Sequence, residues 1–270
     1  MSRPTEPAAL GARAPRIQFS GVGRSFGANV ALQSVDLAVY PGQFIAVVGE
    51  SGCGKTTTLK MINRLLEPDR GEVLIDGQST HSQPPHLLRR RIGYVFQRIG
   101  LFPHMTVAEN IGITPRLLGW HAARIGSRVS ELLALVHLAP EFARRYPAGL
   151  SGGQRQRVGV ARALAANPSI MLMDEPFGSL DPVTRDGLGA EYRKLHDDLQ
   201  LTTVMVTHDV LEAVLLADRI VVMRHGTIAA VGTARELMSN ADDGVRRLLD
   251  MPRRQALRVA ALLDGAPRNE

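Results

Sequence analysis

A glycine-rich segment near the start of the chain restricts the possible folds more than any other feature. Residues 49–56, GESGCGKT, match the phosphate-binding pattern G-x-x-x-x-G-K-[ST]. The pattern requires a strand before it and a helix after it, because backbone N–H groups at the helix start cradle the phosphates. An apolar run, QFIAVVG, leads into the segment, and a helical pattern extends from Lys55 to Leu66. The segment therefore predicts a strand–loop–helix unit that binds phosphate.

The residues of this loop have expected roles. Lys55 is expected to reach the β- and γ-phosphates, and the Thr56 hydroxyl is expected to coordinate Mg²⁺. Cys53 occupies a position that needs a small residue, either as a space filler or as a thiol whose alkylation would block the site. The residues expected to contact the nucleotide are Gly49, Glu50, Ser51, Gly52, Cys53, Gly54, Lys55, Thr56 and Thr57.

An apolar run that ends in two acids is the second informative feature. Ile170 to Glu175 reads IMLMDE, and open parallel sheets bind ligands at the carboxyl ends of their strands. Asp174 is expected to hold Mg²⁺, directly or through water, and Glu175 to polarise the attacking water as general base. Alone the pattern is weak, since many buried strands end in an acid. Beside a phosphate loop it predicts hydrolysis of a nucleoside triphosphate.

The order of strands and helices indicates an α/β fold. Strands are predicted in IQFS, VALQSVDLAVY, QFIAVVG, GEVLIDG, RRIGYVFQ, IMLMD and TTVMVT, and a hairpin in RIVVMRHGTIAAVG. Helices are predicted in much of residues 104–146, from Ser151, over about 184–199 and from about Val210. Because strands and helices alternate over the second half, we expect a mostly parallel sheet covered by helices.

Residues 150–157, LSGGQRQR, carry the third feature. Ser151 and Gln154 fit an S-x-x-Q capping box at a helix start, and an ordinary capped helix is one interpretation. Such a cap does not require glycine at both Gly152 and Gly153, which leave backbone N–H groups open to an anion. The segment resembles the signature of the ABC family without departure. That resemblance implies that Ser151, Gly152, Gly153 and Gln154 contact the γ-phosphate bound to a second subunit, in a head-to-tail dimer.

Other positions of the ABC family follow in order. Gln97 in YVFQ matches the glutamine that senses Mg²⁺ and the attacking water, and His208 in VTHD matches the histidine that orients the base. Asp181 in SLD matches the loop that communicates across the dimer, and Phe26 matches an aromatic that stacks on adenine. Considered without the other motifs, residues such as Gln97 and His208 are more often structural than catalytic. The resemblance implies a catalytic set of Lys55, Gln97, Glu175 and His208, and metal contacts from Thr56, Gln97 and Asp174.

The family resemblance also implies an architecture. We expect a P-loop NTPase (RecA-like) α/β core with an antiparallel β subdomain and a helical subdomain inserted at about residues 98–160. The expected segments are a disordered leader over residues 1–15, the ATPase domain over 16–245 and a short basic tail over 246–270. Within that tail, PRRQALRVAALL reads as one amphipathic helix.

Segments outside the catalytic motifs indicate which group within the ABC family the chain resembles. RIGLFPHMTVAENI, DEPFGSLDPVTRDGL and VMRHGTIAAVGTARELM resemble importers of quaternary amines, the glycine betaine, choline and carnitine group. This implies ATP and Mg²⁺ as cofactors, a homodimer, an integral membrane permease and an extracytoplasmic solute-binding protein. The alternatives are an ABC ATPase for another solute, such as an amino acid, or a non-import ABC ATPase. The regulatory modules of some members are not expected, since only a short tail follows Leu249.

Composition excludes other classes. No apolar run approaches the roughly 20 residues that span a bilayer. The single cysteine excludes a disulfide framework and fits a reducing compartment. The net charge of +6 is concentrated in residues 1–24 and 246–270, without the interleaved aromatics that stack on bases. We therefore expect no nucleic-acid partner. The importer resemblance implies a peripheral location on the cytoplasmic face of the inner (plasma) membrane.

Overall fold

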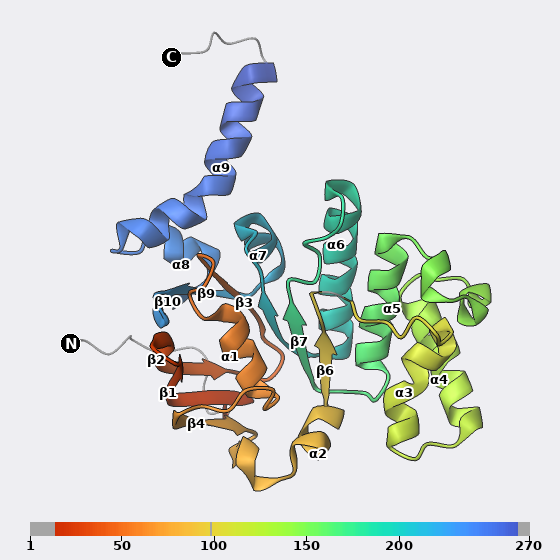
Figure 1. Cartoon of the computed structure of the whole chain (residues 1–270). Coiled ribbons are helices and arrows are strands. Elements are labelled where there is room, and N and C mark those ends of the chain that lie inside the picture. The colour runs from red at the N-terminus through yellow and green to blue at the C-terminus, as the bar shows by residue number, and fades with distance from the viewer. Residues whose placement is uncertain (1–13, 98, 264–270) are drawn as a thin grey trace.

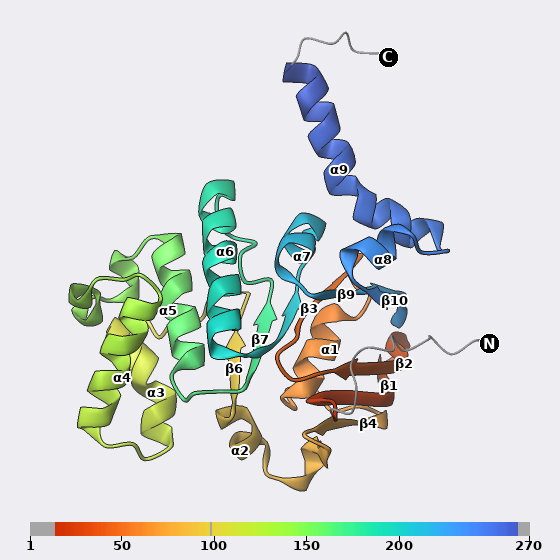
Figure 2. The same ribbon diagram turned by 180° about the vertical axis from the view of Figure 1, so that it is seen from behind.

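The computed structural model describes residues 14–97 and 99–263. The expected leader lies outside the described residues except for residues 14 and 15, and so do residues 264–270 of the basic tail. Figure 1 shows a twisted central sheet with a small second sheet near the N-terminus, a group of helices at the far side and one long C-terminal helix. Figure 2 shows the same arrangement from behind.

The central sheet has six strands in the order β10-β9-β3-β8-β7-β6. Their bounds are β3 Phe44–Gly49, β6 Ile92–Val95, β7 Ile170–Asp174, β8 Thr202–Val206, β9 Arg219–Arg224 and β10 Thr227–Gly232. All neighbours pair in parallel except β9 and β10, which form the predicted hairpin. Every residue of β7 and β8 is buried, as expected for parallel strands covered on both faces. The mostly parallel sheet is confirmed.

A second, antiparallel sheet has the order β2-β1-β4-β5. Its strands are β1 Ile17–Phe26, β2 Asn29–Val39, β4 Arg70–Ile75 and β5 Gln78–Ser79. Ile17 pairs with Val39 on one side and with Ile75 on the other. The predicted antiparallel subdomain is therefore present, and it packs against the central sheet through a shared apolar cluster.

Nine α-helices lie in the described residues. They are α1 Lys55–Ile62, α2 Pro85–Arg90, α3 Val107–Leu117, α4 Ala122–Leu135, α5 Gly152–Leu164, α6 Pro182–Leu199, α7 Val210–Leu216, α8 Ala234–Met238 and α9 Asp243–Leu263. Short 3₁₀ turns cover Thr80–Ser82, Pro140–Arg144 and Pro147–Gly149. Helices α3 and α4 pack together and against α5, which lies beside edge strand β6 (Figure 1).

The helix predicted from Lys55 to Leu66 is shorter than expected. It ends at Ile62, with Asn63 as its C-cap. The next residue, Arg64, has a positive φ of 53°, which no helical residue adopts, and the Asn63 side chain accepts a hydrogen bond from the Leu65 N–H. Backbone bonds from the Arg64 N–H to the Met61 oxygen at 3.1 Å and from the Leu65 N–H to the Lys60 oxygen at 2.9 Å close the helix in the pattern of a Schellman C-cap.

Two apolar cores occupy the two faces of the central sheet. Along β3, Phe44, Ala46 and Val48 contribute to one core, and Ile45 and Val47 contribute to the other. This alternation is the two-residue period of a strand. The first core extends into helices α3 to α7, and the second is shared with α1 and the antiparallel sheet.

Helix α9 contains the predicted amphipathic helix and extends away from the rest of the molecule (Figures 1 and 2). Its first turns bury Val245 and Leu249, whereas Leu257 farther along is 61% exposed. Among the described helices, none is both long enough and apolar enough to pass through a bilayer.

Candidate nucleotide-binding site

The phosphate loop connects the end of β3 at Gly49 to the start of α1 at Lys55. Gly54, the N-cap of α1, has a left-handed φ of 105°. A Cβ atom at Gly54 would lie 2.7 Å from the Ala31 backbone oxygen, and one at Gly49 would collide with the Met223 backbone oxygen. Both positions therefore need glycine, for conformation and for close packing of the backbone.

Lys55 lies beneath the loop with only 7% of its surface exposed. Its Nζ donates to the backbone oxygens of Gly49 at 2.8 Å and of Glu50 at 2.9 Å. No described carboxylate forms an ion pair with Lys55. A buried ammonium that is bonded to two neutral oxygens and, at 4.0 Å, to Cys53 Sγ keeps its charge available to an anion in the loop.

Two oxygen ligands lie side by side next to the loop. Thr56 Oγ1 donates to Asp174 Oδ1 at 3.0 Å, and Asp174 is 7% exposed. Burial raises the pKa of Asp174, whereas the Thr56 hydroxyl acts in the opposite direction. Donating its proton leaves the lone pairs of Thr56 free for a metal, and a hydroxyl beside a carboxylate is the kind of oxygen set that Mg²⁺ prefers.

Glu175 is held in an unusual backbone conformation, with a φ of 46°. Its backbone N–H donates to the Val206 oxygen at 2.8 Å, which ties it to the end of β8. Its Oε2 accepts from Gln97 Nε2 at 2.6 Å and lies 3.4 Å from His208 Nδ1. Positive φ at a non-glycine residue costs of order 1–3 kcal/mol and is concentrated at functional sites. Two other predicted catalytic side chains, those of Gln97 and His208, therefore converge on one carboxylate oxygen of Glu175.

The signature segment forms the start of α5. The Ser151 hydroxyl accepts from the Gln154 N–H at 3.3 Å, and the Gln154 side chain accepts from the Ser151 N–H at 2.9 Å. The predicted capping box is thus confirmed. A Cβ atom at Gly153 would lie 2.8 Å from Thr184 Cγ2, so glycine also allows close contact with α6. Figures 1 and 2 place α1 and α5 on opposite sides of strands β7 and β6, so one chain does not join the signature to its own phosphate loop.

The remaining predicted residues take separate positions. Asp181 is the N-cap of α6 and accepts from the Thr184 N–H at 3.0 Å, a bond that lowers the pKa of Asp181. Phe26 ends β1 with 44% of its surface exposed, and the Arg24 guanidinium lies 5.0 Å from its ring centroid. Cys53 is only 4% exposed, and burial raises the pKa of its thiol. Its buried position agrees with the space-filling interpretation.

Arg162 was not singled out by the sequence patterns. It lies on α5 and donates to the backbone oxygens of Ile99 at 2.6 Å and Gly100 at 2.7 Å. This places a direct link between the signature helix and the segment after Gln97. The contact joins residues far apart in the chain, so no local pattern could reveal it.

Arg185, on α6, was missed for the same reason. It donates to the Leu180 oxygen at 3.1 Å and pairs with Asp209 at 3.2 Å. The loop that precedes Asp181 is thereby fixed to the segment that follows His208.

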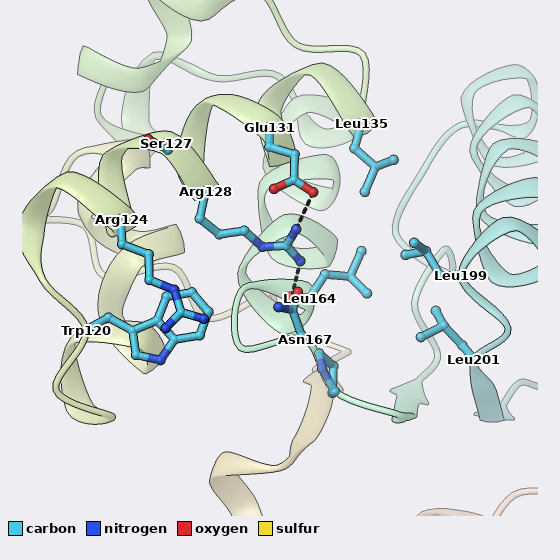
Figure 3. A pocket seen from close by; sticks show the side chains of 11 residues that line it. Trp120, Arg124, Ser127, Arg128, Glu131, Leu135, Leu164, Asn167, Leu199 and Leu201 are labelled. Atoms are coloured by element: carbon cyan, nitrogen blue, oxygen red, sulfur yellow. Dashed lines mark hydrogen bonds and ion pairs between the residues drawn. The ribbon is translucent and has the colours of Figure 1, made fainter.

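One cavity lies away from the phosphate loop, between the helical group and the start of β8 (Figure 3). Its volume is about 570 Å³. The Arg124 guanidinium stacks 3.6 Å from the Trp120 ring on one side, and Leu199 and Leu201 line the other. Arg128 between them donates to the Leu164 oxygen at 2.9 Å. The cavity contains none of the predicted phosphate-binding residues, so it is a separate surface feature.

Comparison with known proteins agrees with this geometry. Residues 32–178 match the family model described as ABC transporter. The chain is 55% identical to the Bacillus subtilis glycine betaine/carnitine/choline transport ATP-binding protein OpuCA over 79% of its length, but spans only 56% of that relative. It is 50% identical to the Escherichia coli glycine betaine uptake system ATP-binding protein YehX, covering 86% of the chain and 75% of the relative.

A solved structure shows the same arrangement of elements. It is the dimeric, post-hydrolysis state of the ATP-binding cassette MJ0796 bound to ADP and Pi. The TM-score is 0.72 at 33% identity, over 80% of this chain and 98% of the other.

Proposed function

Because this chain belongs to the ABC transporter family, we propose that it binds ATP with Mg²⁺, hydrolyses it, and thereby drives uptake of a quaternary amine osmoprotectant through a membrane permease. The observation that carries the ATPase proposal is the convergence on Glu175 Oε2, 2.6 Å from Gln97 Nε2 and 3.4 Å from His208 Nδ1. This carboxylate follows the metal-binding candidate Asp174 directly, at the end of β7.

The residues present fit a magnesium nucleotide. Gly49 and Gly54 allow the backbone conformation and the close packing of the phosphate loop, Lys55 takes part in no described ion pair, and Thr56 with Asp174 supplies oxygen ligands. Bound Mg²⁺ would neutralise the developing negative charge on the phosphates. Lys55 would exchange its two carbonyl acceptors for phosphate oxygens, and Phe26 would offer its exposed ring to the adenine.

Glu175 would act as general base. Its carboxylate accepts a proton from the attacking water, while the Gln97 amide and the His208 imidazole hold the oxygen that receives it. Hydrolysis of this type depends mainly on positioning and on stabilising charge. The strained backbone at Glu175 supports that role, since it fixes the direction of the carboxylate.

A second copy of the chain would complete the site. The N–H groups of Gly152 and Gly153 lie at the positive end of the α5 dipole, which favours an anion. They are remote from the phosphate loop of their own chain, so we propose that they face the γ-phosphate bound by the other copy. The dimeric form of the MJ0796 cassette supports this arrangement.

The membrane permease would dock near the segment that follows Gln97. Phe102 is 40% exposed there, and Arg162 holds Ile99 and Gly100 against the signature helix. Movement of a docked partner would then reach α5 through a charged hydrogen-bonded contact. We place the chain on the cytoplasmic face of the membrane, with an extracytoplasmic binding protein that delivers the solute to the permease.

Uptake in native cells tests the substrate class. Labelled glycine betaine, choline and carnitine would be supplied at high osmolarity to cells that carry wild-type chain or Glu175→Gln, with other betaine carriers deleted and methionine uptake as control. We expect loss of quaternary amine uptake alone. Unchanged uptake of all three would refute the osmoprotectant proposal and favour another solute, or a non-import ABC ATPase if no membrane protein co-purifies.

A further inference from the structure

Tyr94 occupies the strand next to Asp174 and has no role in the site described above. It lies on β6, which pairs in parallel with β7, and Tyr94 is opposite Leu172 in that register. Because alternate residues of a strand face the same way, Leu172 and Asp174 share one face of the sheet. Tyr94 packs against the core on that face, as Leu172 does. Tyr94 is therefore on the same face of the sheet as Asp174, one strand away from it.

The Tyr94 ring is fixed and its hydroxyl is enclosed. The ring centroid lies 4.3 Å from that of Phe96. Tyr94 Oη is shielded from solvent and makes no hydrogen bond of ordinary geometry with a described residue. Burial raises the pKa of Tyr94, and the Asp174 carboxylate raises it further, by its charge and as a hydrogen-bond partner. A buried hydroxyl without an acceptor is unfavourable, so a nearby carboxylate is its natural partner.

Asp174 has room for a second donor. Its Oδ1 accepts from Thr56 Oγ1 at 3.0 Å. A carboxylate has about four lone-pair sites, and donors on its outer side fix its orientation toward a metal. Tyr94 is the unsatisfied donor that the sheet places beside it.

We propose that Tyr94 is a positioning residue for Asp174: its hydroxyl donates to the Asp174 carboxylate and holds it in the orientation that receives the metal of a bound nucleotide. The inference rests on the proposed function, since it requires a nucleotide–metal complex at this site. It assigns no chemical step to Tyr94. The alternative, a ring that only fills space, would be served equally by phenylalanine.

The variant Tyr94→Phe distinguishes a positioning role of Tyr94 from a space-filling role, because it removes the hydroxyl oxygen and keeps the ring. The full-length chain would be loaded with a non-hydrolysable ATP analogue, and Mn²⁺ would be titrated as the probe metal and followed by its electron paramagnetic resonance signal. We expect the Mn²⁺ affinity to fall about 10-fold, the lower end of the effect of removing a group behind a metal ligand. Analogue binding in EDTA should be unchanged, and so should the Tm of the nucleotide-free protein.

Tyr40→Phe is the matched control, because Tyr40 lies in the turn between β2 and β3 and loses the same atom. Equal Mn²⁺ affinity in Tyr94→Phe and wild type would overturn the inference, and so would a loss of Tm large enough to explain a weaker metal site. If wild type itself bound neither the analogue nor Mn²⁺, the proposed function would fail instead. The two failures are therefore distinguishable.

Discussion

The edge of the central sheet beside the phosphate loop, which we call the phosphate-loop edge, is built differently from the signature helix α5. At the edge, side chains from α1 and from the ends of several strands contact one another: Thr56 bonds to Asp174, and Gln97 and His208 approach Glu175. The signature helix is complete by itself, because Ser151 and Gln154 cap each other. The edge is thus assembled by tertiary structure, whereas the signature is assembled by eight consecutive residues.

The difference teaches what one chain can do alone. The edge has the groups that bind phosphate, hold a metal and accept a proton. The signature has a formed helix N-terminus whose cap satisfies Gln154 and leaves the N–H groups of Gly152 and Gly153 for a ligand. Binding should therefore be a property of the single chain, and turnover should need two.

The largest effect should come from removing the base at the edge. We expect Glu175→Gln to lower ATP turnover by about 10²–10⁴-fold, the usual contribution of a general base. The amide keeps the size of the side chain, so affinity for ATP should persist, and a closed dimer should accumulate. Phosphate release and size-exclusion chromatography with ATP would measure both. Glu72→Gln, an exposed change on β4, is the control, and near-normal turnover of Glu175→Gln would exclude Glu175 as the base.

A bulky charged side chain at position 151 tests the role of the signature helix. Ser151→Arg should leave ATP binding by the monomer intact while it blocks dimer closure, with turnover lower by about 10²–10³-fold, as when a charge-stabilising donor is lost. Ser151→Ala controls for loss of the cap, which costs about 1 kcal/mol. Fluorescent nucleotide binding at low protein concentration would report on the monomer. Loss of binding there would mean that the signature acts within its own chain.

A smaller effect, on the pH dependence of stability, is expected at Glu212 on α7. Glu212 on α7 is 9% exposed, and burial raises its pKa from 4.5 to about 6. The folded state holds this proton more tightly, so Glu212 makes its full contribution to stability below about pH 4.5, and this is lost as pH rises through about 6. The difference between the pKa of Glu212 in the folded and in the unfolded state corresponds to about 2 kcal/mol of folding free energy.

Glu212→Gln removes the buried charge and keeps the shape. We therefore expect its Tm to exceed that of wild type by several degrees at pH 7.5, and by much less at pH 4.5. Differential scanning fluorimetry at both pH values measures this, with the same Glu72→Gln control. A Tm difference that does not vary with pH would show that burial does not raise the pKa of Glu212.

Much of the site could be predicted because its motifs are local. The G-x-x-x-x-G-K-T loop, the IMLMDE strand end and the S-x-x-Q cap each depend on neighbours a few residues apart. Arg162, Arg185 and Tyr94 could not be found in this way. Arg162 bonds to Ile99 and Gly100, more than 60 residues earlier in the chain. The end of α1 at Ile62 was also missed, since the left-handed Arg64 and the backbone bonds that close the helix end it before its apolar pattern does.

By itself the sequence determined the phosphate loop, the acidic strand end, the capped signature helix and the alternation of strands with helices. Each follows from short-range physics: glycine conformations, the period of apolar residues, and side chains that bond to nearby backbone. Tertiary structure alone decided that Gln97 and His208 meet at one oxygen of Glu175, that Tyr94 lies on the strand next to that of Asp174, and that α5 stays away from its own phosphate loop. Those outcomes depend on strand order and register, because parallel pairing joins residues that no local pattern connects.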